Sequence, residues 1–303
     1  MLRVNELAAM ADAGKALKLF ETEIPGAPTL QWHFFQTIDT PRWLRPLLRS
    51  RFVMEPQLQL PEPEQGTRSR QWPIAAYLRR MAVADEPNVR ALVAEAIRKV
   101  AGSHNPDVRD QGVGIIAALP TAEAAGLVDV LEGWLSQGLQ HGYFETPVQL
   151  LKAFAQQGYR DPAFTLARAI FRLADEDGSI ATFHSQHMYE HYLPQVVGAL
   201  GDIDSKAGVE LFSDLLMKAA QIGGKLRDGD WTEHTPHRLA DSQMATYGIY
   251  DGLIIAVRDS AYLVIERVPA EIASVVSYLF DLRPRIFKRI ALQVLSRCVS
   301  LVV

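Results

Sequence analysis

The sequence predicts an all-α protein built of stacked helical hairpins. Along most of the chain, apolar residues recur at the three- and four-residue spacing of a helical face. The helices that this spacing predicts have ordinary lengths and short connections, which leaves a globular bundle or a stacked array of hairpins. No segment shows the sustained apolar–polar alternation, bounded by hairpin turns, that a sheet would need.

The clearest part of the pattern is a run of three helices, predicted over residues 87–101, 106–119 and 122–138. Asn105 is the expected N-cap of the second helix, Pro106 takes its first position, and Pro120 ends it. We expect the three helices to pack antiparallel in sequence order. Their shared core should contain Val89, Ile97, Ile115, Leu131 and Trp134.

The same periodicity predicts helices through the rest of the chain. They are expected near 4–21, 28–38, 41–50, 73–84, 146–157, 162–174, 189–200, 205–222, 243–257, 260–267, 269–280 and 284–301. We predict one helical-repeat domain over residues 1–303, with a sub-boundary near 176–188.

A short internal sequence repeat favours a stacked array of helical hairpins over a globular bundle. The segment PNVRALV, which begins at Pro87, returns nineteen residues later as PDVRDQG, so that Val89 and Arg90 correspond to Val108 and Arg109. Proline followed by Val-Arg at a helix start resembles the HEAT-type repeats. This resemblance covers residues 85–140, and it implies an α-solenoid of stacked helical hairpins.

Composition and the lack of reaction motifs favour a cytoplasmic protein that is not an enzyme. Of the 303 residues, 48% are hydrophobic and 22% are charged, the net charge is −4, and Cys298 is the single cysteine, which fits a reducing compartment. The sequence lacks a signal peptide and an apolar run long enough to span a membrane. It also lacks GxSxG, HExxH and a complete phosphate-binding loop, so we predict no catalytic residue and no cofactor.

A proline-rich stretch, residues 51–73, interrupts the helices early in the chain. We expect it to cross the surface in an extended form, with Trp72 held between helices as an anchor. Together with its flanking segments PRWLRPLLRS and QWPIAAYLRRMA, over residues 41–83, it resembles helical regions of large, mostly uncharacterised bacterial proteins. Some of those proteins carry NTPase or nuclease modules and are suspected of anti-phage defence, but the resemblance implies no catalytic residue here.

Residues 41–80 are also basic, with eight arginines against three acidic residues. Arginines beside aromatic side chains can bind phosphates and stack on bases, which makes this region a candidate nucleic-acid surface. The alternative is that Trp43, Trp72 and Tyr77 pack the first helices while the arginines cover their outer faces. The candidate binding residues are Arg42, Arg45, Arg49, Arg51, Arg68, Arg70, Trp72, Arg79 and Arg80.

Two histidine-containing segments are the candidates for metal binding. In FHSQHMYEHY, the residues His184, His187 and His191 fall largely on one helical face, a spacing that can hold zinc in a hydrolase. The alternative is that the segment is a polar helix face or an irregular loop between helices. The second segment, residues 223–243, is rich in Asp and His and reads either as a functional loop or as a solvated insertion.

These observations predict a non-catalytic scaffold or protein-interaction module of a larger bacterial protein, bound to a protein partner or to neighbouring domains of its own polypeptide. A nucleic-acid-binding module that uses residues 41–80 is the alternative, and a metal-dependent hydrolase is the third possibility. The last helix is expected to carry an apolar stripe of Ile286, Ile290, Leu295, Val299 and Val302 and a second apolar flank. From this we expect the chain to be a fragment of a longer protein.

Overall fold

The computed structural model describes residues 1–24, 28–54, 72–139, 145–182, 185–226, 229 and 248–302. Helix dominates these residues, so the all-α prediction is confirmed. The chain divides into two compact units, Met1–Pro147 and Val148–Val303. Residues 176–188, where the sequence predicted a sub-boundary, lie within the second unit.

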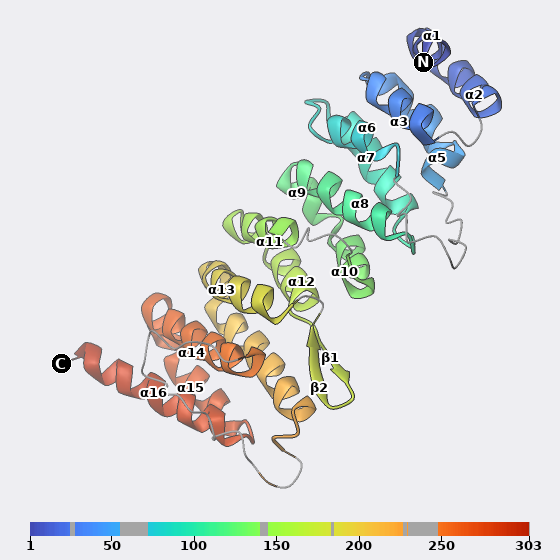
Figure 1. Ribbon diagram of the computed structural model, residues 1–303. Coiled ribbons are helices and arrows are strands. Elements are labelled where there is room, and N and C mark those ends of the chain that lie inside the picture. Colours follow the sequence, from blue (N-terminus) through green and yellow to red (C-terminus); the bar gives the residue numbers. More distant parts are fainter. Residues whose placement is uncertain are drawn as a thin grey trace. The chain divides into compact units, whose positions relative to one another are not determined.

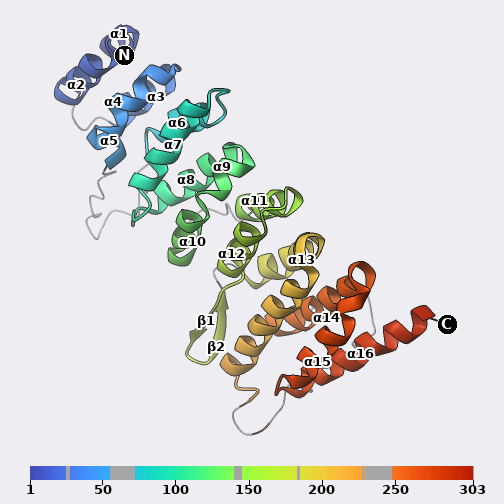
Figure 2. The same cartoon turned by 180° about the vertical axis from the view of Figure 1, so that it is seen from behind.

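The first unit consists of short helices (Figures 1 and 2). They are α1 (Leu2–Ala9), α2 (Ala13–Glu23), α3 (Pro28–Thr37), the 3-10 helix η1 (Pro41–Trp43), α4 (Leu44–Leu48), α5 (Arg51–Met54), α6 (Ala75–Ala82), α7 (Pro87–Lys99), α8 (Pro106–Ala118), α9 (Thr121–Ala125) and α10 (Val128–Gln137).

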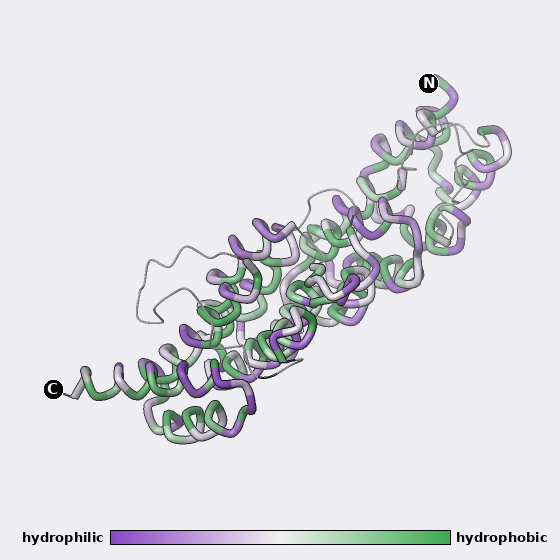
Figure 3. Tube along the Cα trace, turned by 60° about the horizontal axis from the view of Figure 1, so that its bottom comes forward, coloured by the Kyte–Doolittle hydropathy of each residue, from purple (hydrophilic) through white to green (hydrophobic). Residues whose placement is uncertain are grey.

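Helices of the first unit pack beside one another in two rows. In one row α1 contacts α3, α3 contacts α6 and α6 contacts α8, and in the other α2 contacts α4 and α4 contacts α7. Aromatic rings fill the core near the start of the chain, where Phe34 stacks on Phe20 at 4.3 Å and meets the Trp43 ring edge-on at 5.3 Å. The alternation of apolar and polar colour along the helices in Figure 3 reflects this arrangement of buried and exposed faces.

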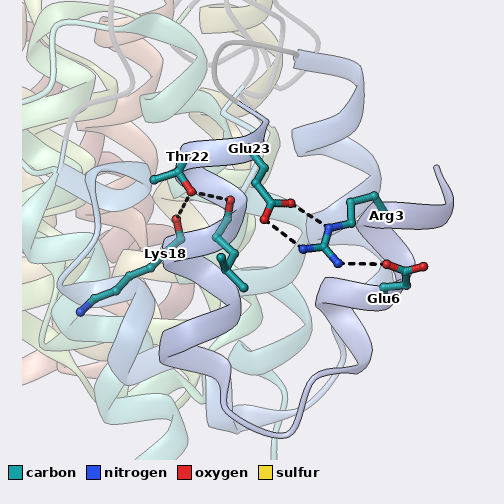
Figure 4. Close-up of polar contacts among 6 residues, drawn as sticks. Arg3, Glu6, Lys18, Thr22 and Glu23 are labelled. Carbon is teal, nitrogen blue, oxygen red and sulfur yellow. Dashed lines mark hydrogen bonds and ion pairs between the residues drawn. The ribbon is translucent and has the colours of Figure 1, made fainter.

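The predicted helix 4–21 is instead two helices. The chain leaves α1 at Met10, and Asp12 caps α2 by accepting a 2.9 Å hydrogen bond from the backbone N–H of Lys15. Arg3 then ties α1 to α2, because its guanidinium pairs with Glu23 at 2.7 Å and with Glu6 at 3.0 Å (Figure 4). The apolar spacing continues across the cap, so the spacing alone predicted one helix.

The predicted core residues of the central helices are confirmed. Val89, Ile97, Ile115, Leu131 and Trp134 are all buried. Asn105 caps α8, and prolines occupy the first positions of α7 and α8. Gly112 on α8 faces the six-membered ring of Trp134 on α10, so these two helices approach closely. The predicted helix 122–138 is divided at Gly126 and Leu127 into α9 and α10.

The second unit contains longer helices and one hairpin. Its elements are α11 (Glu145–Gln156), which begins at the end of the first unit, α12 (Arg160–Ile170), β1 (Leu173–Glu176), β2 (Ser179–Thr182), α13 (Gln186–Ile222), α14 (Ile249–Arg267), the 3-10 helix η2 (Pro269–Glu271), α15 (Ile272–Asp281) and α16 (Arg285–Val302). Extensive packing between α13 and α14 forms the centre of this unit.

Helix α13 is kinked at Asp204, whose backbone is not helical, so the predicted segments 189–200 and 205–222 lie on either side of the kink. The Asp204 carboxylate accepts a 2.9 Å hydrogen bond from the backbone N–H of Ala207 and a 2.8 Å bond from Arg160 of α12. In contrast, the break predicted between 257 and 260 is wrong. There α14 continues through Arg258 and Ser260, both of which are buried.

The β-hairpin is the clearest departure from the predicted fold. Helix α12 ends at Ile170, short of the predicted 174, and β1 pairs with β2 in antiparallel register, Glu176 opposite Ser179. Asp177 and Gly178 form the turn with φ of 54° and 80°, as a two-residue hairpin loop with positive φ at both positions requires. The Asp-Gly pair was the available signal, but its flanking residues lack apolar alternation.

Candidate interaction surfaces

The predicted basic residues are spread over several elements of the first unit. Arg42, Arg45, Arg49, Arg51 and Arg79 are exposed. Arg42 donates to the carbonyl of Ala8 at 3.2 Å, and Arg51 donates to that of Glu21 at 3.3 Å. Arg68 and Arg70 lie outside the described residues. The exposed arginines therefore belong to η1, α4 and the residue after it, α5 and α6.

Arg80 has a structural position. Its Nη2 donates to the carbonyl oxygens of Phe35 at 2.6 Å and Ile38 at 2.9 Å, at the carboxyl end of α3. A cation there satisfies backbone acceptors that the helix leaves without intrahelical donors. Arg80 thus joins α6 to α3.

The aromatic residues among these arginines lie in the core. Trp43, Trp72 and Tyr77 are 1%, 2% and 0% exposed. The Tyr77 hydroxyl donates to the carbonyl of Thr40 at 2.9 Å, and burial raises its pKa. The Trp72 backbone N–H donates to the carboxylate of Asp107. Trp72 is therefore buried as expected of an anchor, and none of these three rings offers a face on which a base could stack.

The two arginines of the internal sequence repeat make equivalent contacts. Arg90 donates to the carbonyl of Asp85 at 2.7 Å and pairs with Glu123 of α9 at 2.8 Å. Arg109 donates to the carbonyl of His104 at 3.3 Å and to that of Gly138, past the end of α10, at 3.0 Å. Each arginine thus ties the turn before its own helix to a segment about one hairpin further along.

Arg109 is buried on α8, and this burial lowers its pKa. Its Nη1 also donates to the side-chain oxygen of Gln137 at 3.1 Å, so the buried charge is held by three acceptors. In the sequence, Arg109 was identifiable only as a repeat position. Its burial depends on the end of α10, where Gln137 and Gly138 accept hydrogen bonds from its side chain.

The histidine segment provides two exposed imidazoles on the first turns of α13. His187 and His191 are exposed, and His191 lies 3.4 Å from the side-chain nitrogen of Gln195. His184 lies outside the described residues, as do residues 227–228 and 230–243 of the second polar segment. Within the described part of the chain, no three His, Cys, Asp or Glu side chains gather closely enough to hold a metal ion.

Among the described residues of the second unit, helix α16 carries the most continuous apolar exposure. Leu292, Leu295 and Val299 are 57%, 38% and 64% exposed. Their spacing of three and four residues places them on one face. Of the predicted apolar stripe, Ile286 and Ile290 are buried, whereas Leu295 and Val299 lie on this exposed face. The side chains buried on α16 are those of Ile286, Phe287, Ile290, Ala291 and Val294.

None of the helices in the described ranges is both long enough and apolar enough to cross a bilayer. Comparisons with protein-family models, with curated proteins and with solved structures found no match.

Proposed function

We propose that the protein is a non-catalytic, HEAT-like helical-repeat scaffold, a bacterial and cytoplasmic interaction module that binds a protein partner or neighbouring domains of its own polypeptide. The observation that carries the proposal is the packing of the first unit. Each helix of a row lies against the next helix of that row, so successive hairpins bury one another's apolar faces. Arrays of this kind build extended binding surfaces from many short elements.

The arginine contacts support the same proposal. Arg90 and Arg109 follow proline and valine at the start of consecutive helices, and both bond to a carbonyl five residues back and to a segment far ahead in the chain. In a repeat array the contacts between successive hairpins recur along with the helices, whereas a globular bundle does not require such recurring contacts. The shared PxVR pattern therefore has a shared mechanical role.

The exposed apolar face of α16 is the proposed protein-binding surface. A continuous apolar face is a typical feature of protein-interaction sites, whereas single exposed apolar residues are normal on any surface. Leu292, Leu295 and Val299 form such a face over about two helical turns. An α-helix of a partner, or a further hairpin, could cover it by ordinary helix packing.

The test is quantitative affinity purification from cells that produce the protein, with the double variant Leu295→Glu, Val299→Glu. Both side chains are exposed, so the folded state should survive the change. The control is Val83→Glu, which places the same charge on a 66% exposed residue of the first unit. We expect a specific partner that the double variant loses at least about tenfold and the control keeps, a difference of about 1.4 kcal/mol or more. Identical partner sets for all three proteins would contradict the proposal.

A further inference from the structure

Three neighbouring helices of the first unit expose cations on their surfaces. We call the six residues the basic stripe: Lys15, Lys18, Arg45, Arg49, Arg98 and Lys99, all of which are exposed. Two belong to α2, two to α4, where Arg49 is the C-cap residue, and two to α7, and α4 contacts both of the other helices. The stripe thus joins residues from three places in the sequence.

Each of the three helices turns its opposite face into the core. The buried residues are Ala16, Leu17 and Phe20 on α2, Leu44, Leu47 and Leu48 on α4, and Val93, Ala96 and Ile97 on α7. With one face of each helix fixed in the core, the cations are directed outward. Arg98 donates to the carbonyl of Gly126 at 2.6 Å and so keeps its charge at the surface.

Acidic side chains neutralise little of this charge. Glu23 is engaged by Arg3, and Figure 4 shows the Lys18 side chain extending away from that pair. Glu95 lies 3.8 Å from Lys99 at an exposed site, where an ion pair contributes little. Within the described chain, neither lysine of α2 and neither arginine of α4 has an acidic side chain within ion-pair distance.

The composition of the stripe distinguishes between classes of partner. Protein interfaces are organised around buried aromatic and apolar anchors, and they are poor in lysine. No large apolar side chain is exposed on α2, α4 or α7, all of which the structure describes in full. Contacts to a nucleic-acid backbone, in contrast, need only cations and hydrogen-bond donors.

The absence of exposed rings on α2, α4 and α7 distinguishes duplexes from single strands. Single-strand binding relies on aromatic side chains that stack with successive bases. Phe20 is the single aromatic residue on these three helices, and it is buried, as is Trp43 immediately before α4. A duplex presents only its charged backbone to such a surface.

We propose that the basic stripe binds the phosphate backbone of a nucleic-acid duplex. Packed helices lie about 8–10 Å apart, so α2, α4 and α7 span roughly 16–20 Å. That length corresponds to about five or six base-pair steps of 3.4 Å. The surface reads no bases, and its binding is independent of sequence. Of the arginines predicted as binding residues in the 41–80 region, the basic stripe contains Arg45 and Arg49. Its other cations come from α2 and α7.

The test compares two fourfold glutamine variants of the whole chain. The stripe variant is Lys15→Gln, Lys18→Gln, Arg45→Gln and Arg49→Gln. The control variant removes two lysines and two arginines from exposed sites of the second unit, Arg168→Gln, Arg172→Gln, Lys218→Gln and Lys288→Gln. Both variants change the net charge by the same amount, and circular dichroism checks that both retain the helical fold.

Binding is measured by fluorescence anisotropy with a labelled DNA duplex of about 30 base pairs, at salt concentrations between about 50 and 200 mM. We expect the stripe variant to bind at least about tenfold more weakly. The slope of log K against log salt should fall by up to about 3.6, which is about 0.9 for each of four lost phosphate contacts. The control variant should match the parent protein.

Four results would overturn the proposal. They are no duplex binding by the parent protein at the lowest salt, equal losses in the two variants, tighter binding of a single strand of the same length, and tighter binding of poly-glutamate. The last of these would indicate an acidic protein as the partner. These measurements do not involve the α16 variants, so the duplex-binding proposal and the scaffold proposal can fail independently of each other.

Discussion

Replacing Gly112 by alanine tests how closely α8 and α10 pack. A Cβ atom at this position would lie 2.5 Å from Cζ3 of Trp134 and closer still to Cη2. The ring cannot easily move away, because Trp134 is fully buried and its Nε1 donates to the carbonyl of Ala101 at 2.9 Å. Overpacking of this kind costs about 1–3 kcal/mol.

A second glycine provides the matched control. Gly133 lies within α10, next to Trp134, and a Cβ there would meet no atom within 4 Å. Alanine in a helix interior is favoured over glycine by about 1 kcal/mol, and this gain is common to both variants. The difference between Gly112→Ala and Gly133→Ala therefore isolates the packing cost of about 1–3 kcal/mol.

Urea unfolding followed by circular dichroism measures both variants. Gly133→Ala should raise the free energy of unfolding, whereas Gly112→Ala should lower it or leave it little changed. If Gly112→Ala stabilises the protein as much as Gly133→Ala does, the close approach of α8 to the Trp134 ring is wrong.

Three further predictions concern single contacts. In Gly201→Ala the new Cβ would clash with Cδ1 of Leu263, the far end of a flexible side chain, while Leu263 Cβ and Arg267 Nη1 would lie at 3.4 Å. The cost should therefore stay below about 1 kcal/mol in the same urea assay. Arg109→Met should lower the free energy of unfolding by about 2–3 kcal/mol, because it leaves the acceptors at the end of α10 without their charged donor. The hydrogen bond from Lys206, followed by that from Ser274, lowers the pKa of Glu271. The ionised Glu271 carboxylate therefore stabilises the fold above the unfolded pKa of about 4.3, and this stabilisation is lost as the pH falls through the lower folded pKa. Lys206→Met should raise that pKa in an NMR titration, and an unchanged value would show that the pair does not form in solution.

Local sequence signals were sufficient for much of the fold. Asn105 followed by Pro106 marked the start of α8, and the spacing of Val89 and Ile97 identified the buried face of α7. Such features act over three or four residues, so a single sequence displays them directly. The predictions were wrong where two local signals competed. The apolar period ran across the Asp12 cap and predicted one helix in place of α1 and α2. The Asp177–Gly178 turn was flanked by strands without alternation, so the hairpin was not predicted.

The candidate surfaces depended on tertiary structure to a much greater extent. The sequence showed that arginines and aromatic residues alternate around Trp43, but only the packing showed that Trp43 and Tyr77 are core residues. Lys15, Arg45 and Arg98 lie on neighbouring helices because α4 packs against both α2 and α7, contacts that no spacing in the sequence encodes. On α16, a shift of one residue decided that Val294 is buried and Leu295 exposed. Helical periodicity is a property of neighbouring residues, whereas the choice of buried face follows from the side chains of other helices that fill the space against it.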